Sequence, residues 1–235
     1  MKSLDIVTIN FNDSDGIFNT LESFSSIDYA RHAVRHIIID GGSSDGSVSL
    51  IEKFSLNNSY AEFISEPDGG IFNALNKGIA RSNSGYILFI NSGDLICADS
   101  LEHFFASKNN CSFYIFDTIF DYGTKKKYKS VRNLNFYWGM PFCHQSIIID
   151  GGLHRDFPYQ EDNLYADYVF FKEFLKDNYQ IINRPLSIYK TGGVSDIASF
   201  KSLISYISVH FHYYSFRSIL LFLFLSVRIL KNKIL

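Results

Sequence analysis

The stretch Ser65–Asp94, SEPDGGIFNALNKGIARSNSGYILFINSGD, decides the fold of this 235-residue chain. It holds a turn, then an amphipathic helix expected over Gly70–Ser82, a buried strand expected over Tyr86–Ile90, and an acidic loop that ends at Asp94. In open α/β sheets, ligands bind at the carboxyl ends of the strands. The stretch therefore predicts an α/β fold with its chemistry around Asp94.

The residues that precede this stretch continue the alternation of strand and helix. Short apolar runs that end in polar residues predict buried strands, and apolar residues at helical spacing predict helices. The strands are expected at Leu4–Phe11, Val34–Asp40 and Ala61–Ser65, and the helices at Gly16–Phe24 and Val48–Phe54. This order predicts a parallel sheet with right-handed crossovers.

Beyond Asp99 the pattern is looser. Strands are expected at Cys111–Phe116, Tyr128–Val131, Ser146–Asp150 and Leu186–Tyr189, and a helix at Tyr165–Lys176. The chain contains no internal repeat and no low-complexity linker, so residues 1–199 are expected to form one domain.

Composition narrows the class of protein. The 22 Lys and Arg residues nearly balance 24 Asp and Glu residues, which argues against a nucleic-acid binder. The three cysteines have no CxxC spacing, which favours a reducing compartment. The first residues, MKSLDIVTINFN, lack the long apolar run of a signal peptide and resemble a first strand.

Residues 200–235 differ from the rest because they are rich in Tyr, Phe, Leu and Ile, with interspersed cations. The apolar run between Arg217 and Arg228 is ten residues long, whereas a bilayer needs about 20. We expect an amphipathic helical extension that lies on a membrane surface and contacts its lipids. The alternative is a helix packed on the core or on a second copy of the chain, as a homodimer.

Two loops hold candidate ligand-binding residues. Asp40 ends one strand and is followed by GGSSDGS, whose glycines allow a ligand to approach the backbone closely. Asp94 follows the apolar run YILFI, where a carboxylate can hold a hard cation that neutralises phosphate oxygens. Either loop alone is equally well explained as an ordinary turn, but both belong to the same edge of the sheet.

A general base is the third expected component. Asp167 opens the helix ADYVFFKEF, and Glu161 and Asp162 lie just before it. Any of the three carboxylates can act as a base near a diphosphate, although an acid at a helix start is commonly only a cap. His144 either contacts an acceptor or packs in a polar core.

Together these motifs resemble family 2 glycosyltransferases, which are inverting enzymes of the GT-A fold. The resemblance spans about residues 4–195 and rests on VTINFN, IIIDGGSSDGS, EPDGGIFNALNKGI, FINSGD, PFCHQS, ADYVFF and GGVS. The block EPDGGIFNALNKGI is similar to that of a bacterial subgroup that builds O-antigen, capsule and colanic-acid polysaccharides. The resemblance implies a Rossmann-like, mixed and mainly parallel sheet flanked by helices.

The resemblance also implies roles for individual residues. Asp40 would accept a hydrogen bond from the nucleotide base, and Asp94 would hold Mg²⁺ or Mn²⁺ on the diphosphate. Asp167 would be the catalytic base, and His144 and Gln145 would shape the acceptor side. The remaining donor-binding residues would be Thr8, Asn10, Asn12, Gly42, Ser43, Asp68, Lys77, Asn91, Ser92 and Gly93.

The chain departs from the family pattern at four positions. Asn91 and Gly93 replace residues of the DxD motif, so metal binding would rest mainly on Asp94 and the diphosphate. Asn73 stands where the NKG block usually has Asp, and Ala166 where the base is usually preceded by Glu.

The implied function is transfer of a sugar, from UDP by family habit, to a polyprenyl-diphosphate-linked saccharide in bacterial surface polysaccharide synthesis. The enzyme would lie on the cytoplasmic face of the inner membrane. One alternative is a catalytically inactive sugar-binding or nucleotide-binding scaffold of the same fold. A nucleotidyltransferase is disfavoured because NFNDSDG, after the first strand, contains no basic residue.

Overall fold

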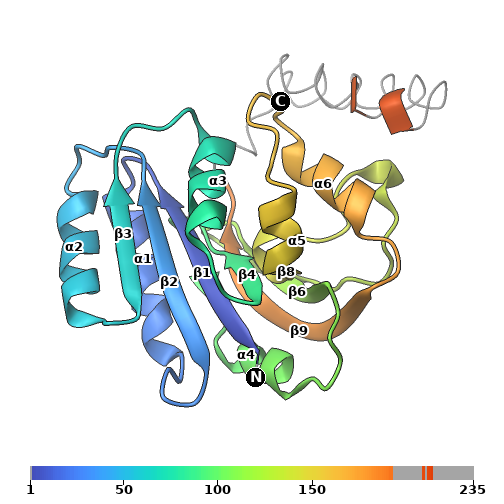
Figure 1. Ribbon diagram of the computed structural model, residues 1–235, viewed down its shortest axis with the longest axis horizontal. Coiled ribbons are helices and arrows are strands. Elements are labelled where there is room, and N and C mark those ends of the chain that lie inside the picture. The colour runs from blue at the N-terminus through green and yellow to red at the C-terminus, as the bar shows by residue number, and fades with distance from the viewer. Residues whose placement is uncertain (1, 193–207, 210, 214–235) are drawn as a thin grey trace.

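The computed structural model describes residues 2–192, 208–209 and 211–213, and within them one sheet of nine strands is flanked by helices (Figure 1). The strands are β1 (Ser3–Asn10), β2 (Ala33–Asp40), β3 (Ala61–Ser65), β4 (Tyr86–Phe89), β5 (Leu95–Ile96), β6 (Phe113–Asp121), β7 (Lys126–Lys129), β8 (Ile147–Asp150) and β9 (Tyr179–Lys190). Their order in the sheet is β3-β2-β1-β4-β8-β6-β9-β5, and β7 pairs with β6.

The first half of the sheet is parallel, as the sequence predicts. β1 pairs with both β2 and β4, and β2 pairs with β3. The register sets Asn10 beside Asp40 and Asp40 beside Ser65. Polar residues from three strands therefore meet at one edge of the sheet.

The second half of the sheet is mixed. β8 is antiparallel to both β4 and β6, so β6 runs in the direction of β1. β9 is parallel to β6, while β5 and β7 pair antiparallel with β9 and β6. The carboxyl ends of β6 and β9 thus lie at the same edge as those of β1 and β2.

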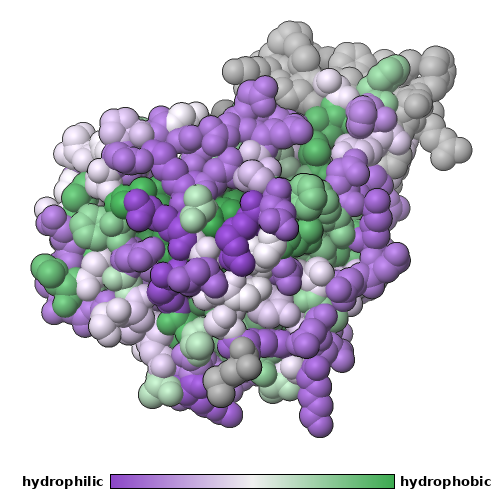
Figure 2. Space-filling model, in the orientation of Figure 1, coloured by the Kyte–Doolittle hydropathy of each residue, from purple (hydrophilic) through white to green (hydrophobic). Residues whose placement is uncertain are grey.

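Helices cover both faces of the sheet (Figure 1). The helices are α1 (Ser14–Ser23), α2 (Ser47–Asn57), α3 (Ile71–Arg81), α4 (Asp99–Ala106), α5 (Gly151–Asp156) and α6 (Ala166–Phe174). Apolar residues of α3 and α6 pack in one core, and those of α1, α2 and α4 in the other. The helices turn polar residues outward, and the face seen in Figure 2 is mostly hydrophilic, with smaller hydrophobic areas.

Helix α3 crosses β1 very closely. A Cβ atom added to Gly78 would lie 2.3 Å from Val7 Cγ1. Of the apolar face expected from the spacing, Ala74, Leu75 and Ile79 are buried, whereas Ile71 in the first turn is 41% exposed. The apolar residues of α3 therefore orient the helix toward the sheet, and Gly78 allows its close approach to β1.

The structure differs from the sequence-based expectations mainly after Asp99. The expected strand Leu186–Tyr189 is the end of the much longer β9, which Pro185 interrupts. Pro185 lies opposite Asp117 at an irregularity of the β6–β9 register, where no ladder hydrogen bond from its nitrogen is needed. The short elements α4, α5 and β5 were not expected.

The expected extension over 200–235 lies outside the described residues, apart from 208–209 and 211–213. Val209 and Tyr213 of this part pack against the core that contains α3 and α6. Among the residues that the structure describes, no helix has both the length and the apolar character needed to cross a bilayer.

Candidate active site

The loop after β2 is organised around the buried carboxylate of Asp40. Its Oδ1 accepts hydrogen bonds from Asn10 Nδ2 (2.7 Å) and Ser43 Oγ (2.6 Å). Its Oδ2 accepts from Gly42 N (3.1 Å), Ser43 N (2.8 Å) and Ser65 Oγ (2.7 Å). Burial would raise the pKa of Asp40, but the bonds from Ser43, Ser65 and Asn10 outweigh it and lower the pKa. Asp40 thus stays ionised and fixes the loop, and contact with a nucleotide base stays a prediction.

Asn12 fastens the same loop from β1. Its backbone nitrogen donates to Ser43 Oγ (2.8 Å), and its Oδ1 accepts from Ser44 N (2.9 Å). Asn12 itself has a φ of 49°, a left-handed conformation that Asn tolerates better than most residues. The exits of β1 and β2 therefore form one hydrogen-bonded unit, which we call the donor cradle (residues 10–12 and 40–44).

The loop between β3 and α3 closes over this cradle. A Cβ atom on Gly41 would lie 2.7 Å from Asp68 Oδ2, so the Asp68 carboxylate sits directly against the cradle. Lys77 Nζ donates to Pro67 O (3.0 Å) and pairs with Glu66 Oε1 (2.8 Å). Asp68 and Lys77, both predicted donor-binding residues, thus belong to the wall beside the cradle.

Three predicted donor-site residues carry buried oxygens without a hydrogen-bond partner among the described residues. These are Thr8 Oγ1, Asn10 Oδ1 and Asn91 Oδ1. Leaving such an oxygen unpaired is costly, so its occurrence in a native fold calls for a specific explanation. All three lie on or just after β1 and β4, the central parallel strands, which supports a ligand or ordered-water site there.

The loop after β4 brings Asp94 to the middle of the same edge. Ser92 N donates to Ile9 O (3.0 Å), which holds the loop beside the end of β1. Gly93 has a φ of 90°, which favours glycine, and Asp94 is only 4 % exposed. Asp94 Oδ1 accepts from Lys190 N (2.9 Å) at the end of β9.

A divalent cation at Asp94 would need ligands from the substrate as well as from the protein. In the described part of the chain, no group of three or more His, Cys, Asp or Glu residues could form a metal cage. Mg²⁺ commonly needs none, since one or two carboxylates, substrate phosphates and waters complete its octahedron. Asp94 would be the protein ligand in such a site.

Asp167 lies in the first turn of α6 and is half-buried. Its Oδ1 accepts from Tyr168 N (2.7 Å), but desolvation dominates and raises the pKa of the carboxyl to about 6. A carboxylate with this pKa is ionised at neutral pH yet binds a proton more readily than an exposed one. This is the behaviour that a general base requires.

Glu161 is held differently, which separates it from Asp167 as a candidate base. Its carboxylate accepts from Asn76 Nδ2 (3.1 Å) and Asn73 Nδ2 (2.8 Å), and these bonds lower its pKa. The contact also accounts for Asn73, since Asp at that position would set two carboxylates against each other. The departure at position 73 is therefore matched by a partner on another loop.

The predicted acceptor residues His144 and Gln145 form hydrogen bonds within the protein. His144 Nε2 bonds to the Tyr159 hydroxyl (2.8 Å), and Gln145 Oε1 accepts from Cys143 Sγ (2.9 Å). Burial lowers the pKa of His144 to about 3, so its imidazole is neutral. Direct contact of either residue with an acceptor stays a prediction.

Burial raises the pKa of the Cys143 thiol to about 12. Asp94 adjoins the donor cradle, because Ser92 N beside it donates to Ile9 O at the end of β1.

Sequence reasoning missed several residues that position this site. Asp13 accepts from Ser92 Oγ (2.9 Å), and Thr20 Oγ1 donates to Asp94 O (2.8 Å). Asn76 Nδ2 donates to Tyr159 O (2.8 Å), and Asn76 Oδ1 accepts from Tyr159 N (2.9 Å). Only Asp13 had a local signal, as an acid just before the expected helix Gly16–Phe24.

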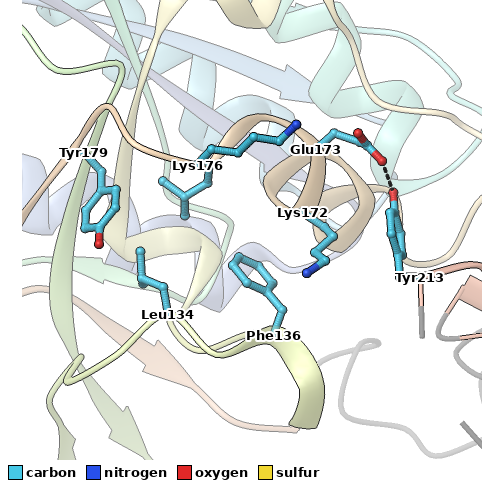
Figure 3. A pocket seen from close by; sticks show the side chains of 8 residues that line it. Leu134, Phe136, Lys172, Glu173, Lys176, Tyr179 and Tyr213 are labelled. Carbon is cyan, nitrogen blue, oxygen red and sulfur yellow. Dashed lines mark hydrogen bonds between the residues drawn. The ribbon is translucent and has the colours of Figure 1, made fainter. Parts of the chain in front are cut away.

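One hollow on the described part of the molecule does not belong to this site (Figure 3). Its volume is about 640 Å³, and it lies between α6 and the segment that contains Leu134 and Phe136. Tyr213 closes one side by donating to Glu173 Oε1 (2.7 Å), and none of the predicted site residues lines it.

The fold is that of the GT-A glycosyltransferases. The family model for glycosyl transferase family 2 matches residues 5–161, so the chain belongs to that family. The sequence-based assignments of family and fold are therefore confirmed.

A curated relative is an uncharacterised glycosyltransferase of Mycobacterium tuberculosis, which is 38% identical over 92 residues. That alignment covers 39% of this chain and 34% of the relative, so the match spans about a third of the relative's length.

Two solved structures show the shared fold. Staphylococcus aureus TarS in complex with UDP-GlcNAc has a TM-score of 0.69 at 14% identity, with 88% of this chain and 65% of that chain covered. The mannosyltransferase PcManGT of Pyrobaculum calidifontis, in complex with GDP-Man and Mn²⁺, has a TM-score of 0.65 at 14% identity. That match covers 90% of this chain and 63% of the other.

Proposed function

We propose that this chain is an inverting glycosyltransferase that moves one sugar from a nucleotide sugar to a lipid-linked saccharide acceptor. The observation that carries the proposal is the edge of the sheet where the ends of β1, β2 and β4 bring Asp40 and Asp94 together beside the buried oxygens of Thr8, Asn10 and Asn91. This edge would bind the diphosphate, and Asp167, whose pKa is raised to about 6, would supply the base.

The donor cradle would bind the nucleotide. Thr8, Asn10 and Asn12 would line the base pocket, with Asp40 holding its shape. Asp68 and Lys77 would face the ribose, sugar or phosphates from the loop beside it. UDP is the expected nucleotide, and the UDP-GlcNAc complex of TarS, which shares the fold, supports that choice.

The chemistry would be one displacement. Asp167 accepts the proton of the acceptor hydroxyl as that oxygen bonds to the anomeric carbon. The bond from this carbon to the diphosphate breaks, and its electron pair leaves on the phosphate oxygen. Because the acceptor oxygen would attack from the face opposite the diphosphate, the configuration at the carbon would invert. A divalent cation held by Asp94, Mg²⁺ or Mn²⁺, would supply charge neutralisation at the departing diphosphate.

The cellular role follows from the resemblance described above. We propose that the enzyme acts in bacterial surface polysaccharide synthesis, such as that of O-antigen, at the cytoplasmic face of the inner membrane. Residues 200–235 would attach it to lipid. Removing residues 200–235 is expected to shift the protein from the membrane to the soluble fraction, and unchanged recovery with membranes contradicts this attachment.

Nucleotide binding tests the proposal first. A thermal-shift panel of UDP, GDP and dTDP sugars, each with Mg²⁺ or Mn²⁺, is expected to identify at least one stabilising donor. The variant Asp94→Asn should lose the extra shift that the cation produces. Stabilisation by no nucleotide sugar contradicts the proposal.

Turnover of the identified donor separates an enzyme from an inactive scaffold. Asp167→Asn should lose transfer or donor hydrolysis by at least about 100-fold. Asp162→Asn, which changes an exposed acid upstream, is the matched control and should retain activity. Equally absent turnover in the wild type and in Asp167→Asn favours the scaffold.

A further inference from the structure

A second hollow, of about 440 Å³, lies in the C-terminal half of the sheet and has no role in the function proposed above. Its walls come from the end of β7 and from the segment that follows it. They include Lys129, Ser130, Arg132, Asn133, Asn135 and Gly139. The volume is within the range of small-molecule sites, and five of the eight lining residues are polar or charged, the others being Gly139, Met140 and Pro141.

This hollow, the Lys129–Arg132 hollow, is positively charged. Its lining residues include two cations and no carboxylate. Among the described residues, neither Lys129 nor Arg132 has an acidic partner within ion-pair distance, whereas Lys126 on the same strand pairs with Asp121 at 3.5 Å. Two exposed, unneutralised cations that border one hollow favour an anionic ligand.

The backbone that carries these cations is fixed by a buried acid. Asp117 on β6 is 1 % exposed. Its Oδ2 accepts from the Tyr128 hydroxyl (2.5 Å), and its Oδ1 accepts from Val131 N (2.8 Å). The residues immediately before Lys129 and before Arg132 are thereby held, so both cations extend from an anchored backbone rather than from a loose loop.

The hollow lies on the opposite side of Asp94 from the donor cradle. The cradle belongs to β1 and β2, Asp94 follows β4, and the hollow belongs to β6 and β7, which come later in the strand order. Its lining includes residues 139–141, which the chain follows with Phe142, Cys143 and the predicted acceptor residues His144 and Gln145. This position on the far side of Asp94 from the donor cradle is the side on which an acceptor would lie.

We propose that the Lys129–Arg132 hollow is an acceptor subsite that binds a phosphate group of the acceptor. The inference that the bound phosphate belongs to the acceptor rests on the proposed function. Binding of an anion to the hollow can be measured independently of that function. Arg presents a planar fork that matches two phosphate oxygens, and Lys adds a compact charge. The bound phosphate would hold the acceptor while its hydroxyl reaches Asp167.

Inorganic pyrophosphate is the probe, titrated calorimetrically into the protein saturated with UDP, so that the donor cradle is filled. Lys129→Ala and Arg132→Ala are each expected to weaken pyrophosphate binding about 10-fold. Lys127→Ala is the matched control, because it removes the same charge two residues away on β7 and outside the hollow. The affinity for UDP should be equal in all four proteins.

The outcomes separate the two proposals. Equal pyrophosphate binding by the wild type and by Lys129→Ala/Arg132→Ala, or competition between pyrophosphate and UDP, overturns the subsite. Failure of UDP, GDP and dTDP alike to bind, with pyrophosphate binding still dependent on Lys129 and Arg132, contradicts the glycosyltransferase proposal and leaves an anion site.

A last comparison identifies the carrier of the phosphate. Glycerol 3-phosphate in solution represents a soluble acceptor, and neutral phosphatidylcholine vesicles with added polyprenyl phosphate represent a lipid-linked one. Binding of either probe that is lost in Lys129→Ala/Arg132→Ala supports the subsite and assigns the carrier. If the double variant binds either probe as tightly as the wild type does, the subsite is overturned.

Discussion

Replacing Asp167 by Asn should make the protein more stable and less active. The pKa of this carboxyl is raised from 3.8 to about 6 because the folded protein desolvates it. Between these two pH values the folded state holds a proton that the unfolded state has released, so stability falls as pH rises through this window. The amide has no charge to desolvate, and its Oδ1 can still accept from Tyr168 N.

The magnitude follows from the size of the shift. About two pKa units at about 1.4 kcal/mol each give a ceiling of about 3 kcal/mol for the gain in unfolding free energy above pH 7. The gain should shrink through the window between pH 6 and pH 4 and lose its pH dependence below about pH 3.8. The buried histidines also titrate in acid, but they are present in both proteins and cancel in the difference.

Urea denaturation of the wild type and of Asp167→Asn, at pH 7.5 and pH 4, measures the effect. A stability difference of about 3 kcal/mol corresponds to roughly 1 M in the midpoint for a chain of this size. Glu161→Gln is a control of opposite sign: the pKa of Glu161 is lowered, so its removal should cost stability at neutral pH and less in acid.

Two results would refute the reasoning. One is a stability gain for Asp167→Asn that is the same at both pH values, since that excludes the charge as its cause. The other is retained turnover, since the same carboxylate is assigned as the base. The wild-type rate should also rise with pH through about 6 and then level, as the base form becomes populated.

Three further substitutions probe the surroundings of the site. Asp40→Asn should cost about 2–4 kcal/mol in unfolding free energy and weaken nucleotide binding, because its amide group would face hydrogen-bond donors in the loop; unchanged nucleotide affinity contradicts this. Asn73→Asp should raise the pKa of Glu161 and destabilise the protein, because two carboxylates then face each other. Added salt should reduce this destabilisation by screening the repulsion. An NMR titration of Glu161 that shows no rise in its pKa rules out the contact. Gly78→Ala should cost about 1–3 kcal/mol despite the better helix propensity of Ala, because its Cβ would overlap Val7; a neutral or stabilising effect in urea denaturation shows that α3 can move off β1.

The parallel half of the fold could be predicted because its signals are local. Each of β1, β2 and β4 is an apolar run bounded by polar residues, and α3 has a clear apolar face. β9 was underpredicted because Pro185 divides it, and only its long-range pairing with β6 shows that a register irregularity accommodates the proline. The short α4 and α5 offered too few helical turns for periodicity to be recognised.

The site likewise has residues that local sequence signals predict and contacts that they do not. The positions of Asp40 and Asp94 at strand ends follow from topology, and Asp167 from its place at a helix start. Contacts that connect distant segments could not be predicted, such as Lys190 N to Asp94 and Asn73 to Glu161, which join residues 96 and 88 positions apart. Asn73 therefore looked like a lost acid in the sequence, although its amide has a partner.

The strand order has a consequence for how such enzymes diversify. The donor cradle and Asp94 are encoded by one continuous stretch, residues 3–94, and the Lys129–Arg132 hollow and Asp167 by the stretch that follows. β4 and β8 form the seam between them, so under the function proposed above, recombination of two family members near residue 100 would join the activated-sugar preference of one parent to the recipient preference of the other. New glycosidic linkages could then arise in a single genetic step, without gradual redesign of either pocket.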